Sequence, residues 1–246
     1  MGCVVVTGAA GGIGQALTHA FAEGGHAVIG VDVAPAPVDS PGEHHVVCDL
    51  ALMAADEVYA DEVFAVVREA LRGRPLLALV NNAAVQVLRP VPTLNRDAWR
   101  CTLDVNLLAP FLWTQALLPE LSATHGCVLN ISSIHARLTK PGFVAYATSK
   151  AALSGMTRAM AVELGSKIRV NAIEPAAIDT AMLRAGFADN PAGYRELTLY
   201  HPTRAIGSPE DMAVLARAIV DQPGGFANGS VIAFDGGIGA VLHDPG

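Results

Sequence analysis

Charged and aromatic side chains are scarce in this chain of 246 residues. Only 16% of the residues are Asp, Glu, Lys or Arg and 5% are aromatic, whereas 52% are hydrophobic. The basic residues are scattered without a run, and the formal net charge is −7 at pH 7. We therefore expect neither nucleic acid nor an anionic membrane as the main partner. The apolar content suffices for one large core or two small ones.

Cysteine and histidine lack the spacings that typically bind metal or form a disulfide framework. The four cysteines are Cys3, Cys48, Cys101 and Cys127, with no C-x-x-C pair, and three of them lie in apolar runs. This pattern indicates buried, reduced thiols. The eight histidines form no H-x-x-x-H or H-x-x-E-H pattern, so no metal site is expected.

We also expect neither a targeting segment nor a membrane-spanning one. No uninterrupted apolar run reaches the length of a membrane span. The chain leads directly into Val4, Val5 and Val6 without the basic segment and cleavage site of a signal peptide. Val6 stands where a myristoylation motif after Gly2 requires Ser or Thr. We expect a cytoplasmic protein with no membrane partner.

Short runs rich in Val, Ile and Leu alternate with longer segments of helical period. The runs predict strands at 3–6, 27–31, 45–48, 76–80, 127–131, 168–172 and 231–234, and the segments predict helices at 12–24, 51–72, 95–121, 145–165 and 208–221. Strands that are apolar throughout are typical of a parallel sheet buried on both faces. The sequence therefore predicts an α/β fold over 1–246: a single doubly wound Rossmann-type domain with a seven-stranded parallel sheet.

One long segment, 179–208, has only weak periodicity. It contains Gly186, Pro191, Gly193, Pro202 and Gly207. A loop of this length in a compact domain is usually a lid or a binding loop. We expect a substrate lid at about 179–206.

A glycine-rich stretch, T-G-A-A-G-G-I-G at 7–14, follows the first strand and opens a helix near Gly12. Glycine allows a tight turn and close approach of the backbone to a pyrophosphate, and the helix N-terminus offers free N–H groups. Glycine also occurs in ordinary turns, so the strand before the stretch and the helix after it carry the interpretation. They predict a dinucleotide site at Gly8, Gly12, Ile13 and Gly14.

The second predicted strand ends at Asp32, from which a carboxylate can accept hydrogen bonds from the adenosine ribose hydroxyls. The alternative is an Asp that merely starts a turn before Pro35. Neither Val33 nor Ala34 is basic, so no cation next to Asp32 favours the 2′-phosphate of NADP. The expected cofactor is NAD.

Tyr146 and Lys150 are four residues apart on a predicted helix and therefore share one face. A free phenol has a pKa of about 10, and a lysine cation one turn away would favour the phenolate needed for general base catalysis. Such a pair alone also occurs on ordinary exposed helices. Ser133 strengthens the catalytic interpretation, because it follows a buried strand at the edge where α/β sheets bind ligands.

In their order and spacing these motifs resemble the short-chain dehydrogenase/reductase family, over essentially the whole chain. The stretch 7–14 matches T-G-x-x-x-G-x-G, 81–84 matches N-N-A-G except at its last residue, 175–180 matches P-G-x-x-x-T except at its second, and 235–237 is the usual D-G-G tail. Ala84 and Ala176 stand where the family usually has glycine. We expect them to change the shape of the pocket without abolishing cofactor binding.

The resemblance implies four catalytic residues, Asn106, Ser133, Tyr146 and Lys150. It implies that Tyr146 transfers the hydroxyl proton, Ser133 binds the substrate oxygen, Lys150 lowers the tyrosine pKa and binds the nicotinamide ribose, and Asn106 organises a proton path. Asp49 would lie beside the adenine and the segment 175–180 would hold the carboxamide. The cofactor-binding residues expected are Gly8, Gly12, Ile13, Gly14, Asp32, Asp49, Leu50, Asn82, Ala83, Tyr146, Lys150, Pro175, Ile178 and Thr180.

Pro110 has no N–H for the carbonyl of Asn106, so a helix that contains both should leave that carbonyl free and bend. In the family this carbonyl resembles the holder of a water that links Lys150 to solvent. A kink that only relieves packing is the alternative.

The expected activity is hydride transfer between NAD(H) and a secondary alcohol or ketone, a small-molecule substrate. A 3-oxoacyl-thioester reductase using NADPH is an alternative that would favour a basic residue near Asp32. A non-catalytic dinucleotide-sensing protein would be expected to lose Tyr146 or Lys150. By position, the substrate wall includes Gln86, His135, Ala177 and Tyr200.

The predicted helices 95–121 and 145–165 are apolar on more than one face, and the sheet can cover only one of them. We therefore expect a homotetramer or homodimer.

Overall fold

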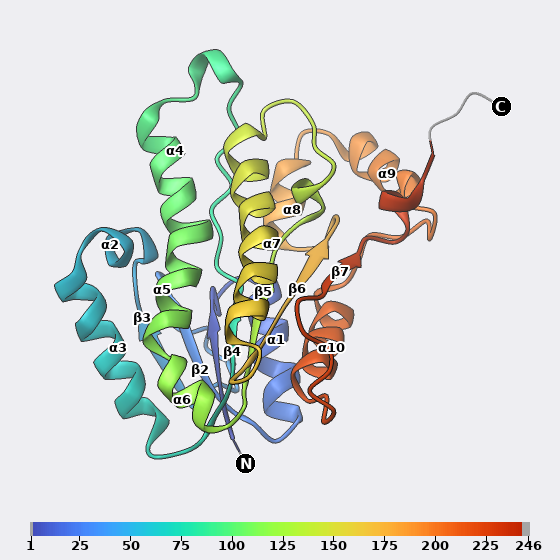
Figure 1. Ribbon diagram of the computed structural model, residues 1–246. Coiled ribbons are helices and arrows are strands. Elements are labelled where there is room, and N and C mark those ends of the chain that lie inside the picture. Colours follow the sequence, from blue (N-terminus) through green and yellow to red (C-terminus); the bar gives the residue numbers. More distant parts are fainter. Residues whose placement is uncertain (1, 243–246) are drawn as a thin grey trace.

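The computed structural model describes residues 2–242, and its centre is one parallel sheet (Figure 1). The strands follow the spatial order β3-β2-β1-β4-β5-β6-β7, and all their pairings are parallel. Their bounds are β1 Cys3–Thr7, β2 Ala27–Asp32, β3 His44–Val47, β4 Leu76–Asn81, β5 Cys127–Ile131, β6 Arg169–Pro175 and β7 Val231–Phe234. The predicted doubly wound α/β fold with seven parallel strands is confirmed.

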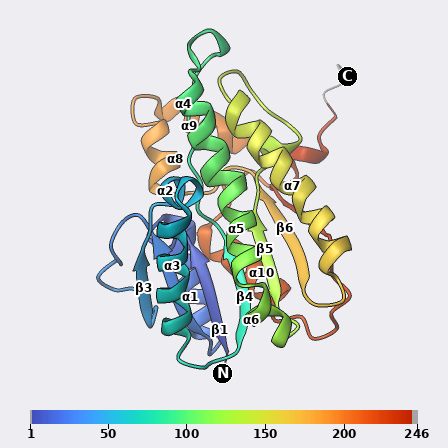
Figure 2. The same ribbon diagram turned by 60° about the vertical axis from the view of Figure 1, so that its left-hand side comes forward.

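Helices cover both faces of the sheet (Figures 1 and 2). Val4 and Val6 of β1 pack in a core with α1 (Gly12–Glu23) and α10 (Pro209–Val220), whereas Val5 packs in the opposite core with α3 (Glu57–Leu71), α5 (Ala109–Ala116) and α7 (Val144–Leu164). Successive side chains of a strand point to opposite faces, so two covered faces require an apolar residue at every position. The central strands β1 and β4 have this composition up to their last residues, Thr7 and Asn81.

Two predicted helices are divided by local hydrogen bonding. Residues 51–72 form α2 (Leu50–Ala55) and α3, because the Asp56 carboxylate accepts hydrogen bonds from the N–H groups of Val58 and Tyr59 and starts a new helix. Residues 95–121 form α4 (Arg96–Leu103), a π-helical turn at Asp104–Leu108, α5 and α6 (Leu118–Ala123).

The π-helical turn lies immediately before Pro110. The Ala109 N–H donates to the carbonyl of Asp104, five residues earlier, where an α-helix would use a spacing of four. Proline supplies no N–H for Asn106, so the hydrogen-bond register can widen here at little cost. The irregularity predicted at this position takes the form of a π turn.

The segment 179–206 is not the long loop expected from its weak periodicity. It folds into α8 (Ala181–Gly186) and α9 (Pro191–Tyr200). Thr180 and Asn190 cap these helices by accepting hydrogen bonds from the N–H groups of Leu183 and Gly193, and Pro191 occupies the first position of α9. Proline and glycine here mark helix ends. A bridge between Ile178 and Gly207 closes the base of the segment.

The remaining expectations concern cysteines, metals and membranes. The four cysteines are free, and burial raises the pKa of the Cys3, Cys48 and Cys127 thiols to about 11. Between residues 2 and 242 no group of His, Cys, Asp or Glu side chains could hold a metal ion. None of the helices in that range is long and apolar enough to cross a membrane.

Candidate active site

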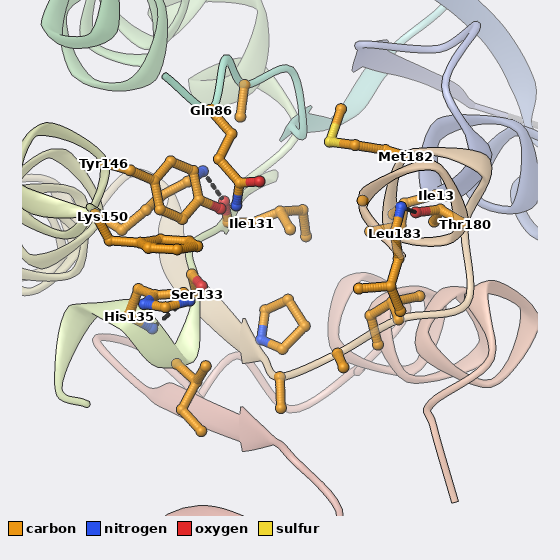
Figure 3. A pocket seen from close by; sticks show the side chains of 18 of the residues that line it. Ile13, Gln86, Ile131, Ser133, His135, Tyr146, Lys150, Thr180, Met182 and Leu183 are labelled. Carbon is orange, nitrogen blue, oxygen red and sulfur yellow. Dashed lines mark hydrogen bonds between the residues drawn. The ribbon is translucent and has the colours of Figure 1, made fainter. Parts of the chain in front are cut away.

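A cavity of about 600 Å³ opens at the carboxyl ends of the strands. The glycine-rich loop after β1 lines one end, and the ends of β5 and β6, the start of α7 and helix α8 line the rest. In Figure 3, Ser133, Tyr146 and Lys150 lie on one side of the cavity and Ile13 and Thr180 on the other. The structure thus brings two separately predicted groups, one for phosphates and one for proton transfer, into one cavity.

The glycine-rich loop is packed so closely that side chains are excluded at two positions. Gly8 has a φ of +67°, and a Cβ on Gly14 would overlap the carbonyl oxygen of Gly8. At Gly11, by contrast, a Cβ would meet only the Gly8 oxygen, at 3.5 Å. No side chain caps α1 after Gly11, and Gly12 and Ile13 of its first turn line the cavity. This cradle fits a pyrophosphate.

The end of β4 supports this loop from the side. The Asn82 amide donates to the carbonyls of Thr7 at 3.0 Å and Gly8 at 3.1 Å, and the Thr7 hydroxyl accepts from the N–H groups of Asn82 and Ala83 at 3.1 Å each. Asn82 and Ala84 also line the cavity. The expected cofactor residue Asn82 therefore has a visible role, which is to hold the shape of the loop.

Asp32 is bonded directly to the glycine-rich loop. Its carboxylate accepts hydrogen bonds from the N–H groups of Ala10 at 2.9 Å and Ala34 at 3.0 Å, so both the turn and the loop depend on it. Asp32 has no ion pair within residues 2–242, and Val33 is exposed. A carboxylate at the rim of the phosphate cradle without a cation beside it fits the expected ribose contact, which remains a prediction.

Asp49 is the N-cap of α2. One carboxylate oxygen accepts from the N–H groups of Ala51 at 2.8 Å and Leu52 at 3.2 Å, and the neighbouring Leu50 is buried. Capping of α2 is therefore sufficient to explain a carboxylate at this position. Its expected position beside the adenine is still a prediction.

Ser133, Tyr146 and Lys150 come from two neighbouring elements. Ser133 follows β5, and its hydroxyl accepts from the His135 N–H at 3.2 Å. Tyr146 and Lys150 lie one turn apart at the start of α7, with the lysine nitrogen 5.8 Å from the centre of the tyrosine ring. The Lys150 ammonium is buried and donates to the carbonyl of Ile131 at 2.7 Å. Strand and helix thereby hold the three side chains at one end of the cavity (Figure 3).

Burial controls the protonation of both groups on α7. It raises the pKa of Tyr146, and a hydrogen bond with Ser133 opposes this shift. Burial also lowers the pKa of Lys150 to about 7. Within the protein alone, desolvation therefore raises the pKa of the Tyr146 phenol by more than the nearby lysine cation lowers it. The lowering of the tyrosine pKa by Lys150 remains a prediction for the protein with a positively charged nicotinamide beside the phenol.

Asn106 is fully buried and does not line the cavity. Its side-chain oxygen accepts from the Val85 N–H at 2.8 Å, and its amide donates to the Val85 carbonyl at 2.9 Å and the Ser149 hydroxyl at 3.0 Å. Ser149 in turn donates to the carbonyl of Tyr146 at 2.7 Å. Asn106 thus ties the chain after β4 to the turn of α7 that carries Tyr146. Its expected part in a proton path is not tested by these contacts.

Three of the four expected wall residues, Gln86, His135 and Ala177, line the cavity. The prediction that Tyr200 lines the substrate site was wrong. Its side chain is more than half exposed, and its hydroxyl donates to Glu196 at 2.8 Å on the outer side of α9. The adjacent His201 is buried and lines the cavity instead. Because 179–206 is helical, neighbouring residues point in different directions, which a loop interpretation could not resolve.

A polar network beside the site was missed altogether. Glu174 is 2% exposed, and its carboxylate accepts from Arg137 at 2.7 Å and from Ser154 at 2.8 Å. Arg137, in the turn after Ser133, also lies 3.7 Å from Asp235 of the D-G-G tail. The network joins the Ser133 turn, β6 and the chain after β7. An acidic residue within the buried strand β6 was the available signal, since buried acids need partners.

Burial of Lys150 predicts a pH dependence of stability. Lysine in the unfolded chain keeps its proton up to a pKa of 10.5, whereas folded Lys150 loses it near 7, so between these values the unfolded state binds more protons. The free energy of unfolding should therefore rise with pH from 7 to 9, by up to about 1.4 kcal/mol per pH unit, and Lys150→Met should lack this rise.

Urea unfolding of both proteins at several pH values measures the difference. The three buried thiols have raised pKa values and therefore lower the free energy of unfolding as the pH rises above 9. Both proteins share this contribution, so it cancels in the difference between them. Parallel pH curves for the two proteins would contradict a depressed Lys150 pKa.

Comparison with known proteins agrees with this geometry. Residues 2–191 match the family model of the short chain dehydrogenase. A 3-oxoacyl-[acyl-carrier-protein] reductase of Thermotoga maritima is 33% identical over 95% of this chain and 96% of its own, and a carbonyl reductase [NADPH] of Sus scrofa is 32% identical over 95% and 94%. The structure of a 4-hydroxyisoleucine dehydrogenase complexed with NADH is 28% identical, with a TM-score of 0.86 over 98% of this chain and 100% of that one. The chain belongs to the short-chain dehydrogenase/reductase family, whose members are oxidoreductases.

Proposed function

We propose that this protein transfers a hydride between NAD(H) and a secondary alcohol or ketone. The observation that carries the proposal is the convergence of Ser133, Tyr146 and Lys150 at one end of a cavity whose other end is a phosphate cradle. When bound, the nicotinamide accepts the hydride in oxidation or supplies it in reduction.

Each side chain at the site has a defined part in the proposed reaction. The Tyr146 hydroxyl exchanges a proton with the substrate oxygen, and the Ser133 hydroxyl binds that oxygen and stabilises its developing charge. Lys150 binds the nicotinamide ribose. Pro175, Ile178 and Thr180, which line the cavity, hold the carboxamide. Burial of Lys150 excludes water from its ammonium, which strengthens its polar interactions.

NAD is proposed as the cofactor because of Asp32. Relatives of this chain include one named for NADPH and one solved with NADH, so membership of the family leaves the choice open. Here a carboxylate lies beside the glycine-rich loop, and neither Val33 nor Ala34 can neutralise a 2′-phosphate. The same observation weighs against an NADPH-dependent 3-oxoacyl-thioester reductase, despite the similarity to the Thermotoga maritima enzyme. Retention of both Tyr146 and Lys150 weighs against a protein that only senses dinucleotides.

The exposed apolar side chains support an oligomer, a homotetramer or homodimer of cytoplasmic enzyme. Leu108 and Phe111 before and on α5, and Val144 and Val162 on α7, are exposed by 37% to 88%. These elements lie side by side on one face of the molecule (Figure 2). Light scattering at micromolar concentration should give a multiple of the 25.5 kDa chain mass, and a 25.5 kDa particle would contradict the proposal.

Tyr146→Phe tests the assigned proton-transfer group. The variant loses only the hydroxyl, so turnover should fall by at least about 10²-fold while NADH still binds, as fluorescence titration can measure. In the unaltered enzyme, alcohol oxidation should become faster from neutral to alkaline pH, because the reaction needs the phenolate. Substantial residual turnover in the variant would refute the role of Tyr146.

Cofactor preference tests the role of Asp32. The 2′-phosphate of NADP would meet a carboxylate and remove its hydroxyl partner, which should favour NAD by about 10²-fold or more in kcat/KM. Asp32→Ala combined with Val33→Arg should narrow or reverse this preference. Equal kcat/KM for the two cofactors in the unaltered protein would mean that Asp32 does not contact the ribose.

A further inference from the structure

The cavity carries positive charge and, among its lining residues that the structure describes, no carboxylate. Its charged lining residues are Lys140 and Lys150. The ammonium of Lys150 is buried and already donates to the Ile131 carbonyl. Lys140 is exposed and makes no ion pair within residues 2–242. It is therefore the cation of this cavity that remains available to a ligand.

Aromatic contacts connect Lys140 to the reaction centre. Its ammonium lies 4.9 Å from the centre of the Phe143 ring, and Phe143 is buried and stacks on His135 at 4.2 Å. Both rings meet Tyr146 edge to face, at 5.8 Å for His135 and 6.2 Å for Phe143. One wall of the cavity thus runs from the Lys140 ammonium to the Tyr146 phenol. A cation–π contact restrains the lysine without neutralising it.

His135 does not supply a second positive charge to a ligand in this cavity. Burial, and then the positive charge of Lys140, lower the pKa of His135 to about 4, so the imidazole is neutral at physiological pH. The effect of Lys140 also means that its ammonium lies close to the ring. The chain as a whole carries a net charge of −7, so the attraction for an anion at this wall is local to Lys140.

The surface opposite and around this wall is largely apolar. Its apolar side chains include Leu88, Leu138, Met182, Leu183, Phe187 and Leu197, and the polar side chains among them are Gln86, Thr139 and His201. A substrate whose reacting carbon lies at Tyr146 and whose other end reaches Lys140 would pass along these side chains. Apolar walls with one charged group at the end bind a chain that has an apolar middle and a charged terminus.

We propose that the substrate is a secondary alcohol or ketone that also carries an anionic group, and that Lys140 binds this group. The proposal rests on the hydride-transfer function proposed above and names its substrate class. The carboxylate of a hydroxy acid and the phosphate of a phosphate monoester are both anionic groups that a lysine ammonium can bind. The identity of the anion is left to the experiment.

The test compares acids with their uncharged esters. 5-Hydroxyhexanoate and 7-hydroxyoctanoate, each beside its methyl ester, are oxidised with NAD by the unaltered enzyme, Lys140→Met, Lys140→Arg and Lys167→Met. Lys140→Met should lower the ratio of kcat/KM for acid over ester by about tenfold, mainly through KM, and Lys140→Arg should largely keep it. Lys167 is exposed and does not line the cavity, so its variant should keep the ratio unchanged.

A binding experiment covers the case in which the panel contains no substrate. Hexanoate, hexyl phosphate and hexanol are titrated into the protein–NADH complex and followed by NADH fluorescence. The anions should bind more tightly than hexanol, and Lys140→Met should remove that advantage. The tighter of the two anions identifies carboxylate or phosphate as the group recognised.

The two proposals fail in different ways. An unchanged acid-to-ester ratio in Lys140→Met, or hexanol binding as tightly as both anions, overturns the role of Lys140, while turnover of an ester that depends on Tyr146 keeps the hydride-transfer function. Turnover that is unchanged in Tyr146→Phe, together with anion binding that depends on Lys140, would instead overturn the proposed function and keep the anion site.

Discussion

Burial of the parallel sheet on both faces determines where this protein can place polar groups. A strand packed in two apolar cores has no room for an unpaired charge until it ends. The glycine-rich loop and Asp32, Asn82 and Ser133 all follow the last residues of their strands or close them. Because parallel strands end at the same edge, residues far apart in the chain are brought to one cavity.

The buried polar side chains Lys150, Asn106 and Glu174 nevertheless have partners close to the site. Lys150 donates to the Ile131 carbonyl, Asn106 is bonded to Val85 and Ser149, and Glu174 is paired with Arg137. Removing one member of such a pair leaves the other desolvated, which typically costs more than the pair contributes. These contacts therefore make the relative position of β5, β6 and α7 insensitive to small changes elsewhere. The reacting side chains gain a rigid support.

Features of the fold and the site could be predicted from the sequence where they depend on residues close together in the chain. Features that depend on contacts between distant residues could not. Apolar runs and periodicity predicted the strands and helices, because these signals are local. Motif spacing selected Ser133, Tyr146 and Lys150 as candidates, and the structure places all three at one cavity. Division of 51–72 at Asp56 was missed, since an Asp inside a helical pattern caps a new helix only if the chain bends there. The helices of 179–206 were missed because proline and glycine were interpreted as loop residues. The Glu174–Arg137 pair spans 37 residues and leaves no local pattern.

Two lysines of one cavity illustrate why position rather than residue type determines function. Lys150 is surrounded by protein, so its charge is costly, its pKa falls to about 7 and its protonation responds to whatever binds beside it. Lys140 is exposed at the same cavity and rests on an aromatic ring. Because this ammonium is exposed, burial does not penalise its charge as it does that of Lys150. Under the proposed function, the buried lysine beside Tyr146 serves the proton transfer and the exposed lysine beside Phe143 serves the selection of substrate.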